Sequence, residues 1–179
     1  MTPVDPNRRI PSHRGIHQRF NGTMHISARV EYAMKALMEL TAAYDEDPHR
    51  LVKSESIARE QEIPSKFLEN ILRGLKQAGF VASQRVADGG FRLAKPPADV
   101  SVADVIRALD GPLAAVRGGP PEEVHYSGHS VHLREVWLAT RAAIREVLEH
   151  VSLEDLASGD LPNPVSGLLD APGAWERRH

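Results

Sequence analysis

Apolar side chains recur at steps of three and four residues over residues 27–44, and this spacing predicts an amphipathic first helix. A short second helix is expected over residues 54–61, with Ser54 as its N-cap. A third helix is predicted over residues 64–78, because it would begin with a proline and end just before Gly79. Its apolar face is expected to consist of Phe67, Leu68, Ile71, Leu72 and Leu75.

Two short apolar stretches, residues 80–83 and 91–94, follow the third helix and are predicted to pair as a β-hairpin. Gly89 and Gly90 would lie at its tip, where glycine permits a positive φ and a close approach of the backbone to another surface. Two prolines at 96–97 end the second strand, because proline cannot donate to a β-ladder.

The later periodic segments predict three more helices. The first begins at Ser101, where Ser101 and Asp104 have the spacing of a capping box. A loop rich in glycine and proline, residues 111–129, precedes a long helix over about residues 130–150. A short helix over residues 152–159 follows.

The order of helix, short helix, helix and tight hairpin is that of a winged helix-turn-helix, so the expected fold class is mostly α with a small β-hairpin. In this fold the third helix enters the major groove of double-stranded DNA, and the hairpin lies along the backbone or minor groove. Basic side chains can hold phosphates there, and Asn or Glu can bond to base edges. An ordinary solvated helix face and a plain hairpin with solvated arginines remain the alternatives. The predicted DNA-binding residues are Ser54, Lys66, Glu69, Asn70, Arg73, Lys76, Arg85, Gly89, Gly90 and Arg92.

The chain is expected to divide into four parts. Residues 1–23 have no helical or strand period and are predicted to be a disordered extension. Residues 24–98 would form the winged helix-turn-helix DNA-binding domain, and residues 99–157 a linker helix, a loop and the long helix. Residues 158–179 are expected to be a flexible tail.

Composition narrows the class of protein. The 179 residues include no cysteine, which excludes disulfides and thiolate metal sites and is compatible with the cytoplasmic location that we expect. No apolar run reaches the length of a membrane span, so no membrane partner is expected. No catalytic constellation or phosphate-binding glycine loop is recognisable, so no enzymatic activity is expected.

Charge is distributed unevenly, although the net charge is only −2. Residues 51–98 hold eight Lys or Arg against five Asp or Glu, whereas residues 99–179 hold seven against thirteen. A basic middle and an acidic remainder could meet phosphate with one face and repel it with the other. Chance unevenness explains the charges equally well.

Several stretches resemble the Rrf-two family of bacterial winged-helix regulators, over about residues 24–157. They are MHISARVEYAMKALMELT, SESIAREQEIPSKFLENILRGLKQAGFVASQRVADGGFRLAKPP, SVADVIRALDGPL and HLREVWLATRAAIREVLEHVSLEDLA. The resemblance implies a homodimeric transcription regulator, usually a repressor, that binds a palindromic operator. It also implies that Glu69 and Asn70 read bases, that Arg85 is the wing arginine, and that Gly89 and Gly90 are the wing glycines.

Members of this family dimerise through the long C-terminal helix. That part of the resemblance places a dimer interface on this helix, although its apolar stripe could instead pack only against its own domain. The implied interface residues are Leu133, Trp137, Thr140, Ile144 and Leu148.

This chain departs from the family at the iron–sulfur cluster that several members hold through cysteines before the dimer helix. A chain without cysteine cannot form the usual cluster, so no cofactor is predicted and cluster-sensing chemistry is not carried over. Some members also take a ligand from the first helix of the partner subunit; Glu31 matches that position, but Lys35 stands one turn later, where a histidine would be wanted. Three histidines could hold zinc or iron with Glu31, but exposed loop histidines are the favoured interpretation. These histidines are His125, His129 and His132.

Two other functions are compatible with the sequence. Some relatives work with a metabolic enzyme that tunes their DNA binding, and the acidic C-terminal third could be a docking surface for such a partner enzyme. A regulator that responds to a metal held by His and Glu is the second alternative.

Overall fold

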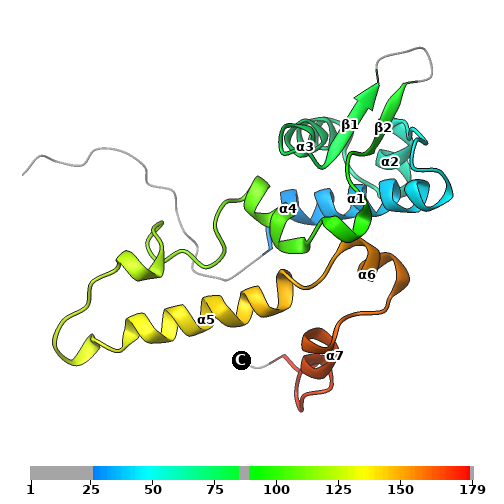
Figure 1. The fold of residues 1–179 in the computed structure, drawn as a ribbon. Helices are drawn as coiled ribbons and strands as arrows, with labels where there is room; N and C mark the ends of the chain where they lie inside the picture. Colours follow the sequence, from blue (N-terminus) through cyan, green and yellow to red (C-terminus); the bar gives the residue numbers. More distant parts are fainter. Residues whose placement is uncertain (1–25, 85–88, 178–179) are drawn as a thin grey trace, which may run out of the picture.

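The computed structural model describes residues 26–84 and 89–177, and its elements follow the order expected from the sequence (Figure 1). In chain order they are α1 (Ala28–Glu46), α2 (Ser54–Glu60), α3 (Ser65–Gln77), β1 (Val81–Gln84), β2 (Gly90–Leu93), η1 (Pro97–Asp99), α4 (Val102–Leu109), η2 (Pro121–Glu123), η3 (Gly128–Ser130), α5 (Leu133–Leu148), α6 (Leu153–Ser158) and α7 (Asn163–Leu169). No helix among the described residues is both long and apolar enough to cross a bilayer. The predicted extension over residues 1–23 lies outside the described residues.

Helix ends agree with the sequence prediction to within a few residues, with one difference in capping. Ser27 is the N-cap of α1, and its Oγ accepts a hydrogen bond from the Val30 N–H at 3.2 Å. Ser54 was expected to cap α2, but Lys53 is the N-cap and Ser54 is the first helical residue. The Ser54 side chain makes no capping bond, so the prediction for this residue was wrong.

α1 is the central element of the hydrophobic core. It contacts α2, α3, α4, α6 and β2, as Figure 1 shows for the helices around it. Ala33 and Ala36 are fully buried on α1, and their small side chains leave room for the neighbouring helices, while Leu37 and Leu40 fill the space between them. The orientation of α3 therefore depends on α1.

Two helices that pack on this core, α4 and α6, each begin with a capping box. Ser101 caps α4 with Asp104, as predicted, and Ser152 caps α6 with Asp155 in the same way. The Ser152 hydroxyl donates to Asp155 Oδ2 at 2.6 Å and the Ser152 N–H donates to it at 2.8 Å; these bonds hold the pKa of Asp155 below its usual range.

The two capping residues also lie side by side. The Val102 N–H donates to the Val151 carbonyl at 2.9 Å, and the Leu153 N–H donates to the Val100 carbonyl at 3.0 Å. Leu153 is fully buried in the same core as α1, and α4 contributes Val105 to it. The core is therefore continuous across residue 98, where the sequence placed the end of the DNA-binding part.

The hairpin pairs β1 with β2 in antiparallel register, from Val81 opposite Leu93 to Gln84 opposite Gly90. A residue outside the hairpin extends it, because Val52 exchanges both backbone hydrogen bonds with Phe91, each 2.8 Å long. The second strand of the hairpin is thus paired, near the hairpin tip, with the segment that leads into α2.

α5 projects away from the helices around α1, with only its C-terminal end near them, and none of its residues is buried (Figure 1). It is shorter than predicted, since residues 128–130 form the 3₁₀ turn η3 instead of its first turn. The expected flexible tail contains a further helix, α7, which contacts α5. Pro164 in its first turn favours a helix start there, a signal that the sequence prediction overlooked.

Replacing Leu153 with Ala should lower the free energy of unfolding by about 2–5 kcal/mol, because it leaves a cavity where α6 packs on α1. Denaturant unfolding of the full chain would measure this loss. Glu154→Ala, at an exposed position of the same helix, is the control and should change stability by less than about 0.5 kcal/mol. Equal stabilities of the two variants would show that α6 is not part of the core.

Candidate DNA-binding surface

α3 has one buried face and one exposed face. Leu68, Ile71, Leu72 and Leu75 are buried in the core, as their spacing predicted. Their burial fixes which side chains point outward.

The exposed face of α3 carries polar side chains that are ordered by local hydrogen bonds. The Asn70 amide donates to the Lys66 carbonyl at 3.2 Å. Arg73 Nη1 in turn donates to Asn70 Oδ1 at 2.9 Å. These bonds hold Asn70 in one orientation, and they leave the second N–H of its amide and the Arg73 fork available to a ligand.

Phe67 does not join the apolar face to which the sequence assigned it. Its side chain is 62% exposed, and so that prediction was wrong. Phe67 precedes Leu68, and successive helical residues lie about 100° apart, which places Phe67 at the margin of the buried stripe.

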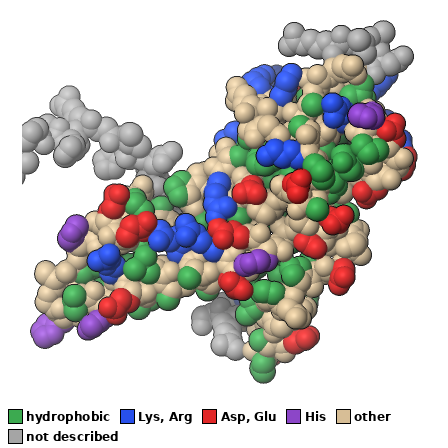
Figure 2. Space-filling view, in the orientation of Figure 1, with side chains coloured by type: hydrophobic (Ala, Val, Ile, Leu, Met, Phe, Trp, Pro, Cys, Tyr) green, Lys and Arg blue, Asp and Glu red, His purple; other side chains and the backbone are tan. Residues whose placement is uncertain are grey.

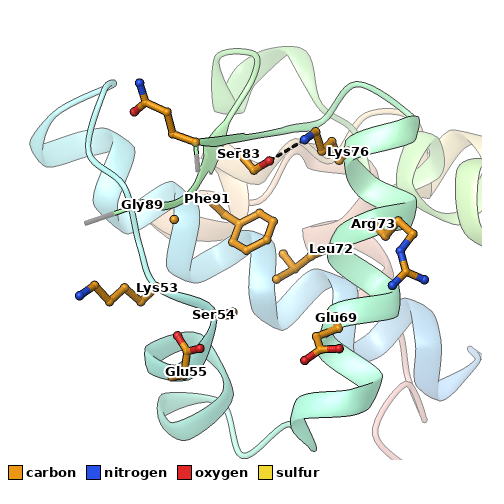
Figure 3. A pocket seen from close by; sticks show the side chains of 12 residues that line it. Lys53, Ser54, Glu55, Glu69, Leu72, Arg73, Lys76, Ser83, Gly89 and Phe91 are labelled. Atoms are coloured by element: carbon orange, nitrogen blue, oxygen red, sulfur yellow. Dashed lines mark hydrogen bonds between the residues drawn. The ribbon is translucent and has the colours of Figure 1, made fainter. Parts of the chain in front are cut away.

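An open groove of about 730 Å³ lies between α2, α3 and the hairpin (Figure 3). One strong contact joins two of its walls, since Lys76 Nζ on α3 donates to Ser83 Oγ on β1 at 2.6 Å. Leu72 and Phe91 lie between the walls. The groove is lined by Lys53, Ser54, Glu55, Glu69, Leu72, Arg73, Lys76, Ser83, Gln84, Gly89, Gly90 and Phe91.

Six of the ten predicted DNA-binding residues line this groove: Ser54, Glu69, Arg73, Lys76, Gly89 and Gly90. Lys66 and Asn70 lie on the exposed face of α3 outside it. Arg92 is half-buried and donates to the Leu93 carbonyl at 3.1 Å, away from the groove lining. Arg85 lies outside the described residues.

The groove mixes charges of both signs. Lys53, Arg73 and Lys76 face it together with the carboxylates of Glu55 and Glu69 (Figure 3). Sequence reasoning missed Lys53 and Glu55, whose only signal was their position beside the start of the second helix. Figure 2 shows Lys and Arg side chains at the hairpin end of the molecule and a second group of them toward the α5 end, with acidic side chains spread over the rest of this face. A phosphate would meet cations at the hairpin end, and a carboxylate beside them would select a hydrogen-bond donor instead.

Gly90 is required for a reason other than the one expected. A Cβ at this position would lie 2.5 Å from the Val52 carbonyl oxygen, and the φ of Gly90 is not positive. The bare backbone of Gly90 therefore lets Val52 pair with Phe91, so the expectation of a positive-φ tip residue was wrong for this glycine.

A family model described as an iron-dependent transcriptional regulator, Rrf2, matches residues 26–159. The chain belongs to the Rrf2 family. Its element order and hairpin are those of a winged helix-turn-helix, and it is a DNA-binding transcriptional regulator.

Relatives from distant bacteria support this assignment. Rv1287 of Mycobacterium tuberculosis, named as an HTH-type transcriptional regulator, is 42% identical over 86% of this chain and 93% of its own length. CymR of Bacillus subtilis, also an HTH-type transcriptional regulator, is 36% identical over 75% of this chain and 91% of its own.

Solved structures from the Rrf2 family have the same fold. The structure of B. subtilis CymR, titled the global cysteine regulator, has a TM-score of 0.64 at 34% identity and covers 76% of this chain and 98% of its own. The structure of T. potens IscR has a TM-score of 0.61 at 29% identity, and the match covers 76% of this chain and 88% of the IscR chain.

The iron named by the family model does not fit the donors of this chain. No cysteine is present anywhere in the sequence. Among the described residues no group of three or more His, Asp or Glu is placed to hold a metal ion. Glu31 instead lies 4.0 Å from Lys35, and His132 is paired with Glu135 at 3.1 Å. Within one chain, Glu31 does not share a metal-binding group with His125, His129 and His132.

Replacing Gly90 with Ala should destabilise the protein by about 1–3 kcal/mol, because the new methyl group would collide with the Val52 backbone. Thermal or denaturant unfolding would measure the loss. Gly167→Ala is the matched control: nothing lies within 4 Å of a Cβ at that helical position, so stability should stay the same or rise. If both variants were equally stable, the Val52–Phe91 pairing would not depend on Gly90.

Proposed function

We propose that this Rrf2-family regulator is a cytoplasmic homodimer that represses transcription by reading a palindromic operator, and that it does so without an iron–sulfur cluster. The observation that carries the proposal is the exposed polar face of α3, locked to the hairpin by the hydrogen bond from Lys76 to Ser83. A helix-turn-helix protein presents such a face to the major groove, with the hairpin beside it. Asn70 and Glu69 would read bases there, while Lys66 and Arg73 would contact phosphates.

The apolar surface of α5 supports the dimer. Leu133, Val136 and Trp137 are 40%, 52% and 36% exposed on a helix with no buried residue. Large exposed apolar side chains grouped on one element mark an interaction surface. A second copy packed on this helix by two-fold symmetry would present two α3 helices to one DNA, which explains why a palindrome is expected.

Protein contacts join α5 to the loop in which the family's cluster ligands would lie. Trp137 Nε1 on α5 donates to the Tyr126 hydroxyl at 3.0 Å. Arg141 Nη1 donates to Glu122 at 2.6 Å. A hydrogen bond from its own backbone N–H and the Arg141 guanidinium both lower the pKa of Glu122, so its carboxylate stays ionised further into acid than an ordinary glutamate. These contacts support the proposal of a loop attached to α5 without a cluster.

Two substitutions on α3 should weaken DNA binding in different ways. Lys66→Ala should weaken binding to all sequences, and the slope of log K against log salt should fall by about 0.9 for each lost phosphate contact. Asn70→Ala should instead relax the preference at one base position, by about 1–3 kcal/mol. Binding of the purified full chain to sites selected from random DNA, measured across a range of salt concentrations, would separate the two effects.

Arg177→Ala is the control for charge, because it removes one cation that follows α7, far from α3 (Figure 1). Its affinity, salt slope and selected motif should match those of the wild type. A selected motif that is unchanged in Asn70→Ala would remove Asn70 from base reading. Failure of the pure wild-type protein to select any DNA would favour a regulator that depends on a partner enzyme.

Leu133→Glu should convert the dimer to a monomer, because it places a charge in the proposed apolar interface. Ala142→Glu is the matched control, since nine helical residues place Ala142 on the side of α5 opposite Leu133, at an exposed position. Sedimentation velocity at equal concentrations would give the two masses. A dimer that persists in Leu133→Glu, or is lost in both variants, contradicts an interface on this face.

A further inference from the structure

Phe67 is a large apolar side chain that is exposed on the surface of the DNA-binding unit. No other residue of α1–α4 is a large apolar side chain with strong exposure among those described. The other exposed side chains of this kind are Ile26, Val131, Leu133, Val136, Trp137, Leu168, Leu169 and Trp175. A single exposed apolar side chain is common on a protein surface and does not by itself mark a contact, so the case for Phe67 rests on its place on α3.

The position of Phe67 on α3 places this ring where bases are read. Phe67 is the third residue of the helix, and the N-terminal residues of a recognition helix meet the base edges. Asn70 follows three residues later, so the two side chains are neighbours on the helix surface. Phe67 is absent from the lining of the groove between α3 and the hairpin, where a phosphate would meet Arg73 and Lys76.

The chemistry of the ring limits what it can recognise. Phenylalanine has no hydrogen-bond donor or acceptor, so it cannot bind a phosphate or pair with the polar edge of a base. The 5-methyl group of thymine is the apolar group that unmodified DNA presents in the major groove, and Phe is a side chain suited to contact it.

We propose that Phe67 sets part of the operator sequence by packing its ring against the 5-methyl group of a thymine, next to the base contacted by Asn70. This inference rests on the proposed DNA-binding function and adds to it an apolar contact that the polar residues of α3 cannot supply. Each half-site of a palindrome would carry one such thymine.

The test removes the methyl group from the DNA and the ring from the protein. The full chain first selects its operator from random DNA, and each thymine of one half-site is then replaced singly by deoxyuridine. Wild-type protein should lose about fourfold in affinity at one position, the effect of losing one buried methyl group, and keep its affinity at the others. Phe67→Ala should bind the thymine and deoxyuridine versions of that position equally well.

Two controls separate a methyl contact from general damage. Asn70→Ala should bind more weakly but still distinguish thymine from deoxyuridine at that position. Phe67→Ala should unfold at the same denaturant concentration as the wild type, because an exposed side chain is removed.

Each remaining outcome decides against the inference. Discrimination that is unchanged in Phe67→Ala, or no thymine whose methyl group matters to the wild type, would overturn the role of Phe67 and leave DNA binding intact. Failure of the wild type to select any DNA would overturn the proposed function as well, and would indicate that the exposed ring contacts a protein instead.

Discussion

Close packing of other elements against α1 positions everything in the molecule that could meet DNA. The small side chains of Ala33 and Ala36 let α3, α4 and α6 approach α1 closely. Leu37 and Leu40 fill the space between the helices. The four buried side chains of α3 pack against this core in one orientation. The polar face of α3 therefore points outward in one direction. The hairpin is then held at two points, on β2 by the pairing of Val52 with Phe91 and on β1 by the hydrogen bond from Lys76 to Ser83. A rigid framework of this kind lets a few exposed side chains keep their spacing when they meet a double helix.

Much of this framework could be predicted because local signals and global packing agree. The three- and four-residue spacing of apolar positions located α1 and α3, the Ser101 capping box located the start of α4, and the glycine pair located the hairpin. Six of the ten proposed DNA-binding residues line one groove because they belong to elements whose order was correct. Residues such as Lys66 and Asn70 were placed on the outer face by the same helical period.

The remaining features depended on contacts between residues far apart in the sequence, which no local pattern reports. Phe67 falls in the apolar period of α3, yet its side chain lies at the margin of the buried stripe and stays exposed. Gly90 has the composition of a turn residue, but its role follows from the backbone of Val52 on another segment. Ser54 differs from a true N-cap by one residue, a shift that sequence preferences do not resolve. The pairing of Ser101 with Ser152 likewise joins two helix starts that the sequence treats as unrelated.

The hydrogen bonds beside Ser101 and Ser152 have a consequence for how this protein can change over evolutionary time. The chain leaves the core after α4 and returns at Val151, next to the point where α4 began. The intervening loop and α5 therefore resemble an insertion into the core domain. The two ends of this insertion are held together by the hydrogen bonds beside Ser101 and Ser152. Such a segment can be lengthened, shortened or exchanged at small thermodynamic cost while its ends remain in place. The segment in which the dimer interface is proposed can thus diversify separately from α3 and the hairpin, and a cysteine-free loop is one form that this arrangement accommodates.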